Sequence, residues 1–234
     1  KMANKTNLFN NMQAQKENNV TMGLEDLFLG GNKANNFASE YGSVMDFYLL
    51  GSIGEASEYI DWFHKIRNSR QTDLINIHIN CPGGNLFTTV QFLQVLEECK
   101  AHLTMNVSGA CMSAATLIFL QGDDFVINEH SAFLFHNYSG GMIGKGGEMY
   151  SNMIHDRKWS EKLFSSQYQD FLTEEEISNL VDDKDIWMDA NTVVERLQAR
   201  GKAREEELEA EMEAAKKAAP KKKTTKKKTT KKTK

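Results

Sequence analysis

The stretch "VSGACMSAATLIFLQG", residues 107–122, joins an apolar strand to an apolar helix and so decides the expected fold. We predict that the strand ends at Gly109 and that the helix begins near Ser113. A helix N-terminus directs unpaired N–H groups and partial positive charge at its first residues. In that setting Ser113 is a nucleophile, a helix cap, since serine is favoured at caps, or a small packing residue of the core. The stretch alone does not decide among the three.

On both sides of this stretch, short apolar segments alternate with longer segments in which apolar residues recur with the period of an α-helix. This alternation predicts βαβ units and a largely parallel sheet. Strands are expected at residues 47–51, 74–80, 103–109, 124–128 and 132–137. In the helix expected around residues 55–68, a single apolar face is predicted from Ala56, Tyr59, Ile60 and Phe63. Further helices are expected from Leu86, at about 147–170, after the Thr173–Glu176 capping box, and after Ala190. The expected class is α/β.

Three regions differ in composition along the chain. Residues 1–42 are rich in Asn, Gly, Lys and Gln and predict a partly disordered N-terminal arm, with one apolar segment at residues 24–29. Residues 43–201 have the pattern of a folded domain. Residues 202–234 predict a charged helix, followed after Pro220 by a disordered Lys-rich tail.

The net charge divides unevenly between body and tail. The whole chain carries −4 and residues 216–234, with eleven lysines and no acid, carry +11, so residues 1–215 carry −15. An acidic body argues against nucleic acid as the ligand of the folded part. The tail is either a solvated extension or a segment that binds an anionic partner in a salt-sensitive way.

The cysteine count and the apolar runs indicate the compartment. Three cysteines without a CxxC pair favour reduced thiols and a cytoplasmic location. The longest nearly apolar run, residues 110–120, is shorter than the roughly 18 residues that a membrane span needs. We expect a soluble protein that does not bind membranes.

The turn in "INIHINCPGGNLF", residues 75–87, is a second candidate for chemistry. A strand is expected to end at Asn80, and the two glycines that follow Pro82 permit positive φ and leave backbone N–H groups uncovered. Such a turn can stabilise an oxyanion. It can equally be a plain tight turn.

His136 is expected at the end of an apolar strand, before a Gly-rich loop. The histidines lack metal-ligand spacing such as HExxH, so no metal site is expected. The loop "GGMIGKGG", residues 140–147, fails the spacing of a phosphate-binding loop, and Gly146 stands where Ser or Thr should follow Lys145. We therefore expect this chain to bind no cofactor and no ATP.

An acid that orients His136 would complete a triad with Ser113. The segment "DDKDIWMDA" offers four candidates, namely Asp182, Asp183, Asp185 and Asp189.

Five motifs in order resemble those of the Clp protease proteolytic subunit (ClpP) family. They are "LLGSI", "INCPGG", "SGACMSAA", "FLFHNYSGGMIGKGGE" and "DIWMDA". Each is weak alone, but the five together at compatible spacing are specific, and the resemblance covers about residues 46–192. It implies a crotonase-like (ClpP-type) β-superhelix of repeated ββα units with a protruding handle helix, and makes residues 43–201 a serine peptidase domain.

The resemblance also assigns roles to residues. It implies Ser113 as the nucleophile, His136 as the general base and Asp185 as the orienting acid. Gly84 and Ala114 fall on the two backbone donors of the oxyanion hole, and Ala114 replaces the methionine of the family pattern while keeping its N–H. The expected activity is endopeptidase hydrolysis of unfolded proteins or peptides through an acyl-enzyme.

The expected partners follow from the same resemblance. It implies a homo-oligomeric ring, a heptamer or stacked rings, whose chamber encloses the active sites, and a separate AAA+ unfoldase as the only link to ATP. Three alternatives stay open. They are a phage head-maturation (prohead) protease of the same fold, acting in the host cytoplasm, a catalytically silent ring or scaffold subunit, and an acyl-CoA enzyme on the related crotonase fold.

Overall fold

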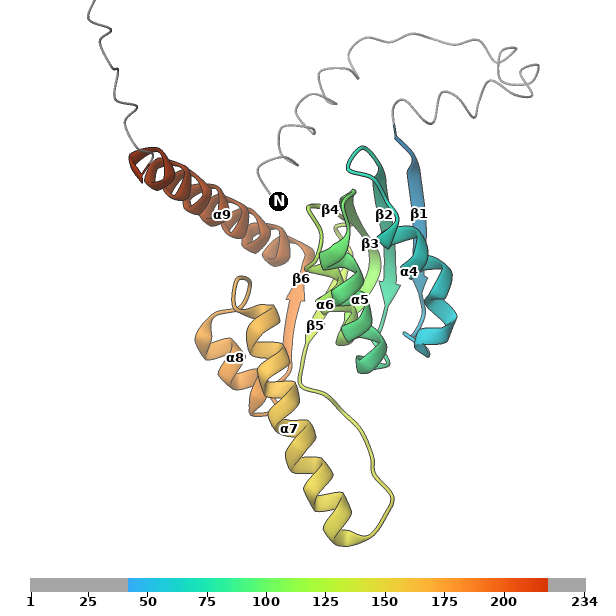
Figure 1. Ribbon diagram of the computed structural model, residues 1–234. Coiled ribbons are helices and arrows are strands. Elements are labelled where there is room, and N and C mark those ends of the chain that lie inside the picture. The colour runs from blue at the N-terminus through green and yellow to red at the C-terminus, as the bar shows by residue number, and fades with distance from the viewer. Residues whose placement is uncertain (1–41, 219–234) are drawn as a thin grey trace, which may run out of the picture.

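The computed structural model describes residues 42–218, which form a mixed α/β fold around a six-stranded sheet (Figure 1). The strands are β1 (Val44–Leu50), β2 (Leu74–Cys81), β3 (His102–Met112), β4 (Asp124–Ile127), β5 (Ala132–Phe135) and β6 (Ile186–Asp189). The helices are η1 (Ala56–Tyr59), α4 (Ile60–Arg67), α5 (Leu86–Glu98), α6 (Ala114–Phe119), α7 (Gly146–Tyr168), α8 (Glu174–Val181) and α9 (Ala190–Ala218). The predicted arm, apart from Gly42, and the tail from residue 219 lie outside the described residues.

The sheet has the order β1-β2-β3-β5-β6, and β4 also pairs with β3. All of these pairings are parallel except β5 with β6, which is antiparallel. The first part of β3 pairs with β4 and its last three residues pair with β5. The prediction of a largely parallel sheet is confirmed. β6 was not expected, because its four residues lie in the acidic segment that the sequence offered only as a source of carboxylates.

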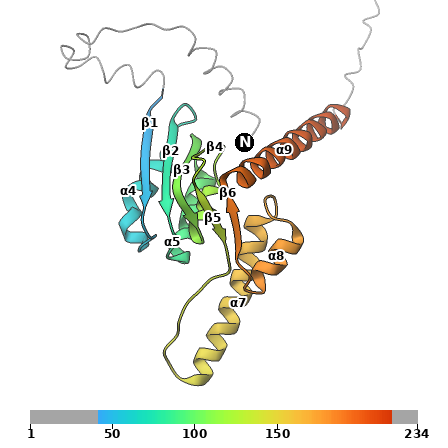
Figure 2. The same ribbon diagram turned by 180° about the vertical axis from the view of Figure 1, so that it is seen from behind.

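Helices α4, α5 and α6 lie on one face of the sheet, and the strands are in front of them when the molecule is seen from behind (Figure 2). The inward side chains of β2 alternate, so Ile75, Ile77 and Ile79 are fully buried beneath these helices. Phe92 of α5 is also fully buried and makes an edge-to-face contact with Phe63 of α4. This core supports the strand ends where the candidate residues lie.

One predicted helix face is wrong in part. Tyr59, Phe63 and Ile66 are buried, whereas Ile60 is 63% exposed. The buried stripe runs through residues 59, 63 and 66, and at about 100° per residue Ile60 lies roughly a quarter turn outside it. The 3-10 turn of η1 precedes this stripe and ends at Tyr59.

After β5 the chain is mostly helical, with β6 as its one strand within residues 136–218, and α7 and α9 extend away from the sheet (Figure 1). The capping box of Thr173 and Glu176 is present at the start of α8, as predicted. α9 continues through Gly201, so the predicted boundary between domain and charged helix falls inside one helix. No helix within residues 42–218 is long and apolar enough to span a bilayer.

Candidate active site

Ser113 is the residue on which the sharp turn from β3 to α6 depends. β3 runs to Met112, three residues beyond the predicted end at Gly109, and α6 begins at Ala114. Between them Ser113 adopts φ 55° and ψ −130°, a conformation that costs a non-glycine residue about 1–3 kcal/mol. This strand–serine–helix junction resembles a nucleophile elbow, although the GxSxG spacing is absent. The strain favours the nucleophile over the cap, and the Ser113 side chain makes no capping bond.

Hydrogen bonds on both sides hold the Ser113 backbone in this conformation. Its N–H donates to the carbonyl of Leu134 at 2.8 Å, and its carbonyl accepts from the Thr116 N–H at 2.9 Å. The Thr116 hydroxyl donates to the same carbonyl at 2.7 Å, so the buried Tyr168 hydroxyl, 2.7 Å away, must donate to Thr116. Burial raises the pKa of Tyr168 well above its ordinary value, which keeps this donor protonated. The serine is thereby tied to β5, α6 and α7.

The Pro-Gly-Gly turn after β2 packs directly against Ser113. A Cβ on Gly83, which has φ 104°, would lie 2.6 Å from the Ser113 Cβ. A Cβ on Gly84, which has φ 147°, would clash with the carbonyl oxygen of Ile53. Both positions therefore require glycine, one because of the serine and the other because of the segment after β1.

The same turn presents a backbone donor. Gly84 forms a parallel bridge with Ile53 that uses the Gly83 carbonyl and the Asn85 N–H, at 2.8 and 2.9 Å. In such a bridge the N–H of the central residue points away from the partner strand. Ala114 occupies the first position of α6, where the N–H has no partner inside the helix. The N–H groups of Gly84 and Ala114 are thus both available to an oxyanion.

Strand register brings His136 close to Ser113. β3 and β5 pair in parallel, with Met112 opposite Leu134, so Ser113 and His136 each lie just beyond the end of the pairing. β5 and β6 pair antiparallel, with Phe135 opposite Ile186. His136 and Asp185 follow this last pair, one residue beyond it on each strand, and line the same cavity. Three segments far apart in sequence therefore meet at one end of the sheet.

The four aspartates of the acidic segment have different environments. Asp189 lies four residues from Asp185 along β6 and accepts a hydrogen bond from the Thr192 N–H at the start of α9, which lowers its pKa. Asp182 caps α8 and lies 4.0 Å from Arg157. Asp183 has φ 62° and accepts a hydrogen bond of 2.8 Å from the buried Asn137 side chain.

Two cavities meet at His136. The first, of about 610 Å³, is lined by Ser113, His136, Gly84 and Ala114 and continues between α5 and α7. The second, of about 490 Å³, is lined by His136 together with Asp183 and Asp185. Within residues 42–218 no hydrogen bond joins Ser113, His136 and Asp185, so the three groups are brought together but not linked in the single chain.

Two thiols beneath the turn are unsuited to act as the nucleophile. Cys81 and Cys111 are opposite each other in the pairing of β2 with β3, and both are fully buried. Burial raises the pKa of both thiols, so neither forms a reactive thiolate readily. Their role here is to pack beneath the turn and β3.

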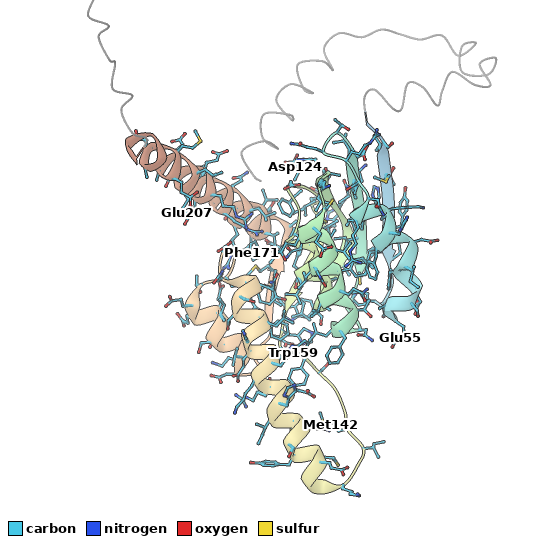
Figure 3. All side chains as sticks on the ribbon, in the orientation of Figure 1. Glu55, Asp124, Met142, Trp159, Phe171 and Glu207 are labelled. Carbon is cyan, nitrogen blue, oxygen red and sulfur yellow. The ribbon has the colours of Figure 1, made fainter. Side chains whose placement is uncertain are left out.

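Several residues of the first cavity were not expected from the sequence. Phe87, Asp156 and Trp159 line it, and Figure 3 shows Trp159 on the side of α7 nearest to α5. Phe87 follows the Pro-Gly-Gly turn closely, and the single tryptophan of α7 is a signal that could have drawn attention to this helix. No local pattern places α7 next to α5, because that contact joins segments about seventy residues apart.

Comparison with known families gives one match. The family model described as Clp protease matches residues 54–196, which is more than half of the chain and includes Ser113, His136 and Asp185. No curated protein matches the sequence.

Proposed function

This chain belongs to the Clp protease family, and on that premise we propose that it is a serine endopeptidase acting through Ser113, His136 and Asp185. The observation that carries the proposal is the strained conformation of Ser113 in a cavity that it shares with His136 and with two backbone donors. Strain of this kind is kept where the surrounding structure fixes it, which is common at active sites.

The proposed reaction begins when the Ser113 Oγ attacks the carbonyl carbon of a peptide bond. His136 accepts the hydroxyl proton as the new C–O bond forms, and Asp185 orients the imidazole and stabilises its positive charge. His136 then transfers the proton to the leaving amine as the C–N bond breaks. Water, deprotonated by His136, hydrolyses the resulting ester and restores Ser113.

The negative charge that develops on the carbonyl oxygen needs donors that are already in place. The Gly84 and Ala114 N–H groups are fixed by the bridge to Ile53 and by the first turn of α6. Loss of one such donor typically costs about 10²–10³ in rate. A methionine or an alanine at position 114 provides the same N–H, so we expect the substitution to alter the pocket and leave the chemistry intact.

We propose that the hydrogen bonds of the triad form when the chain assembles or binds substrate. Catalytic hydrogen bonds are often long in free enzymes and shorten only in the complex. His136 and the loop that follows it lead directly into α7, whose outer side exposes large apolar residues. We propose that α7 is the handle through which subunits join into rings.

Labelling with a fluorophosphonate probe tests the function. The assembled protein should be labelled at Ser113 and should hydrolyse peptides, whereas Ser113→Ala should lose both properties and keep its mass in native mass spectrometry. Ser139→Ala is the matched control, because Ser139 lines the same cavity, and it should still be labelled. The proposal is wrong if the assembled wild-type protein is neither labelled nor active.

The choice of acid is tested by a pair of substitutions in one segment. Asp185→Asn should reduce kcat by about 10⁴, as expected when the orienting acid is lost. Asp183→Asn weakens the contact with Asn137, which positions the turn before β6, and should reduce kcat much less. The reverse order of effects would assign the acid to Asp183.

A further inference from the structure

The active-site cavity extends beyond Ser113 into a part with aromatic walls. Phe87 at the start of α5 and Trp159 on α7 stack with their ring centroids 5.1 Å apart and their planes inclined by 27°. Phe87 is 72% exposed, so this pair borders the cavity instead of filling the core. Phe164 lies about one and a half turns along α7 from Trp159. It is buried and lines the same cavity.

A single acidic side chain lies in this part of the cavity. Asp156 precedes Trp159 by three residues, about one helical turn and 4.5 Å along the axis. Among the residues that the structure describes, no other carboxylate and no Lys or Arg lines the cavity. Within residues 42–218, Asp156 has neither an ion pair nor a side-chain hydrogen bond, although its neighbour Arg157 pairs with Glu161.

We propose that this cavity selects polypeptides with lysine or arginine on the acyl side of the scissile bond, with Asp156 as the specificity-determining residue. The aliphatic stem of such a side chain lies along the Phe87–Trp159 pair, and its cationic group reaches the Asp156 carboxylate. The inference rests on the proposed peptidase function, whose nucleophile lines the same cavity.

The residues that line the cavity favour a basic substrate side chain over an apolar or an acidic one. An aromatic pair alone accepts any apolar side chain, but an apolar side chain would partly desolvate the unpaired Asp156 carboxylate without compensation. An acidic side chain would be repelled by it. A cation near the aromatic faces gains both a cation–π contact and an ion pair, which together correspond to about tenfold in specificity at a partly exposed site.

The test compares fluorogenic peptides that differ only in the residue before the scissile bond, which is lysine, arginine, norleucine or glutamate. For the assembled full-length protein, kcat/KM should be about tenfold higher for the lysine and arginine peptides than for the norleucine peptide. This ratio should decrease at high salt. Asp156→Asn should bring the ratio of lysine to norleucine close to one. Asp156→Lys should favour the glutamate peptide over the lysine peptide.

A matched control uses another carboxylate of the same helix. Glu148→Gln makes the same change of charge on α7, but Glu148 does not line this cavity, so this variant should keep the wild-type ratio. A wild-type preference for norleucine, or an unchanged ratio in Asp156→Asn, would overturn the inference. An equal loss of preference in Glu148→Gln would also overturn it, because the effect would then arise from net charge.

A binding experiment separates this inference from the proposed function. In a Ser113→Ala background, labelled product peptides ending in lysine or norleucine are compared by fluorescence anisotropy. The lysine peptide should bind about tenfold more tightly, and adding Asp156→Asn should remove the difference. If the wild-type protein cleaves nothing, the peptidase proposal fails while this measurement still decides whether the cavity selects a basic side chain.

Discussion

Ser113 combines two features that are costly for a protein to keep, a positive φ and a close contact with Gly83. The first places the Ser113 side chain at the mouth of a cavity instead of in the core. The second brings the Pro-Gly-Gly turn against Ser113, so that Gly84 lines the same cavity as Ser113. Hydrogen bonds to Leu134 and Thr116 hold this arrangement.

Gly83→Ala tests the close contact. The added Cβ would lie 2.6 Å from the Ser113 Cβ, at a φ that alanine rarely adopts. We expect a loss of about 1–3 kcal/mol in the free energy of unfolding and of roughly 10² in peptide hydrolysis, since a displacement near 1 Å can cost that much. Denaturant unfolding and kcat measure the two effects.

The control for this substitution is Gly144→Ala. Gly144 has no positive φ, and an added Cβ would make only an ordinary contact of 3.7 Å with Met149. Stability and rate should change little. If Gly83→Ala also behaved like the control, the close approach of the turn would have no functional importance.

At the scale of elements, β5 is the centre of the site. It pairs in parallel with the end of β3 and antiparallel with β6, so its C-terminal end lies beside both the serine and the acid. A shift of one residue in either register would turn the side chains to the opposite face and separate the three groups. The short strand β6 in turn leads into α9, which is anchored to α8.

A bidentate ion pair joins α8 and α9. Arg196 donates to both carboxylate oxygens of Glu176 at 2.7 Å, and its guanidinium also lies over the ring of Phe171. The bonds from Arg196 lower the pKa of Glu176 from 4.5 to about 2. Both side chains are less than one-third exposed, so solvent screens the pair only in part.

This pair predicts a stability that depends on pH. The Glu176 carboxylate has the lower pKa in the folded state, so its contribution is complete above about 4.5 and is lost as the pH falls toward 2. After allowance for partial exposure we expect about 1–3 kcal/mol. Urea unfolding should show wild type losing this amount between pH 5 and pH 2, whereas Glu176→Gln should lack this part of the dependence. Parallel pH profiles for the two proteins would contradict the assignment.

At the scale of the whole molecule, the exposed apolar residues mark where further copies of the chain are expected. Ile143 in the loop before α7 is fully exposed, and Tyr150, Met153 and Ile154 on α7 are exposed as well. They lie on the part of the molecule that extends farthest from the sheet on the α7 side (Figure 1). Several large apolar residues exposed on one segment are typical of protein interfaces.

Met153→Glu tests whether α7 mediates assembly. A charge at this position should reduce the assembled fraction in native mass spectrometry, and peptidase activity should fall with it if the triad closes only in the assembly. Met212→Glu on α9 is the matched control, since the two methionines are exposed to similar extents, 54% and 49%. Dissociation of the α9 variant alone would place the interface on α9.

Much of the fold could be predicted because its signals are local. Alternating apolar residues indicate β2, the two glycines after Pro82 indicate the turn, and Thr173 with Glu176 indicates the start of α8. These patterns depend on neighbouring residues only. The end of β3 at Met112 was not predicted, because its last residues are held by pairing with β5, twenty-two positions away.

The sequence by itself determined which residue types are available for catalysis and in which order they occur. The local sequence left the role of Ser113 open and the four aspartates equal, and the family resemblance then selected Ser113 as the nucleophile and Asp185 as the acid. Only the tertiary structure gave Ser113 its positive φ and brought Asp185 into the lining of a cavity that His136 also lines. Only the packing of α7 beside α5 brought Asp156 into the cavity that Ser113 and His136 line. The physical reason is that backbone strain, strand register and helix packing are set by contacts between distant segments, which no local pattern records.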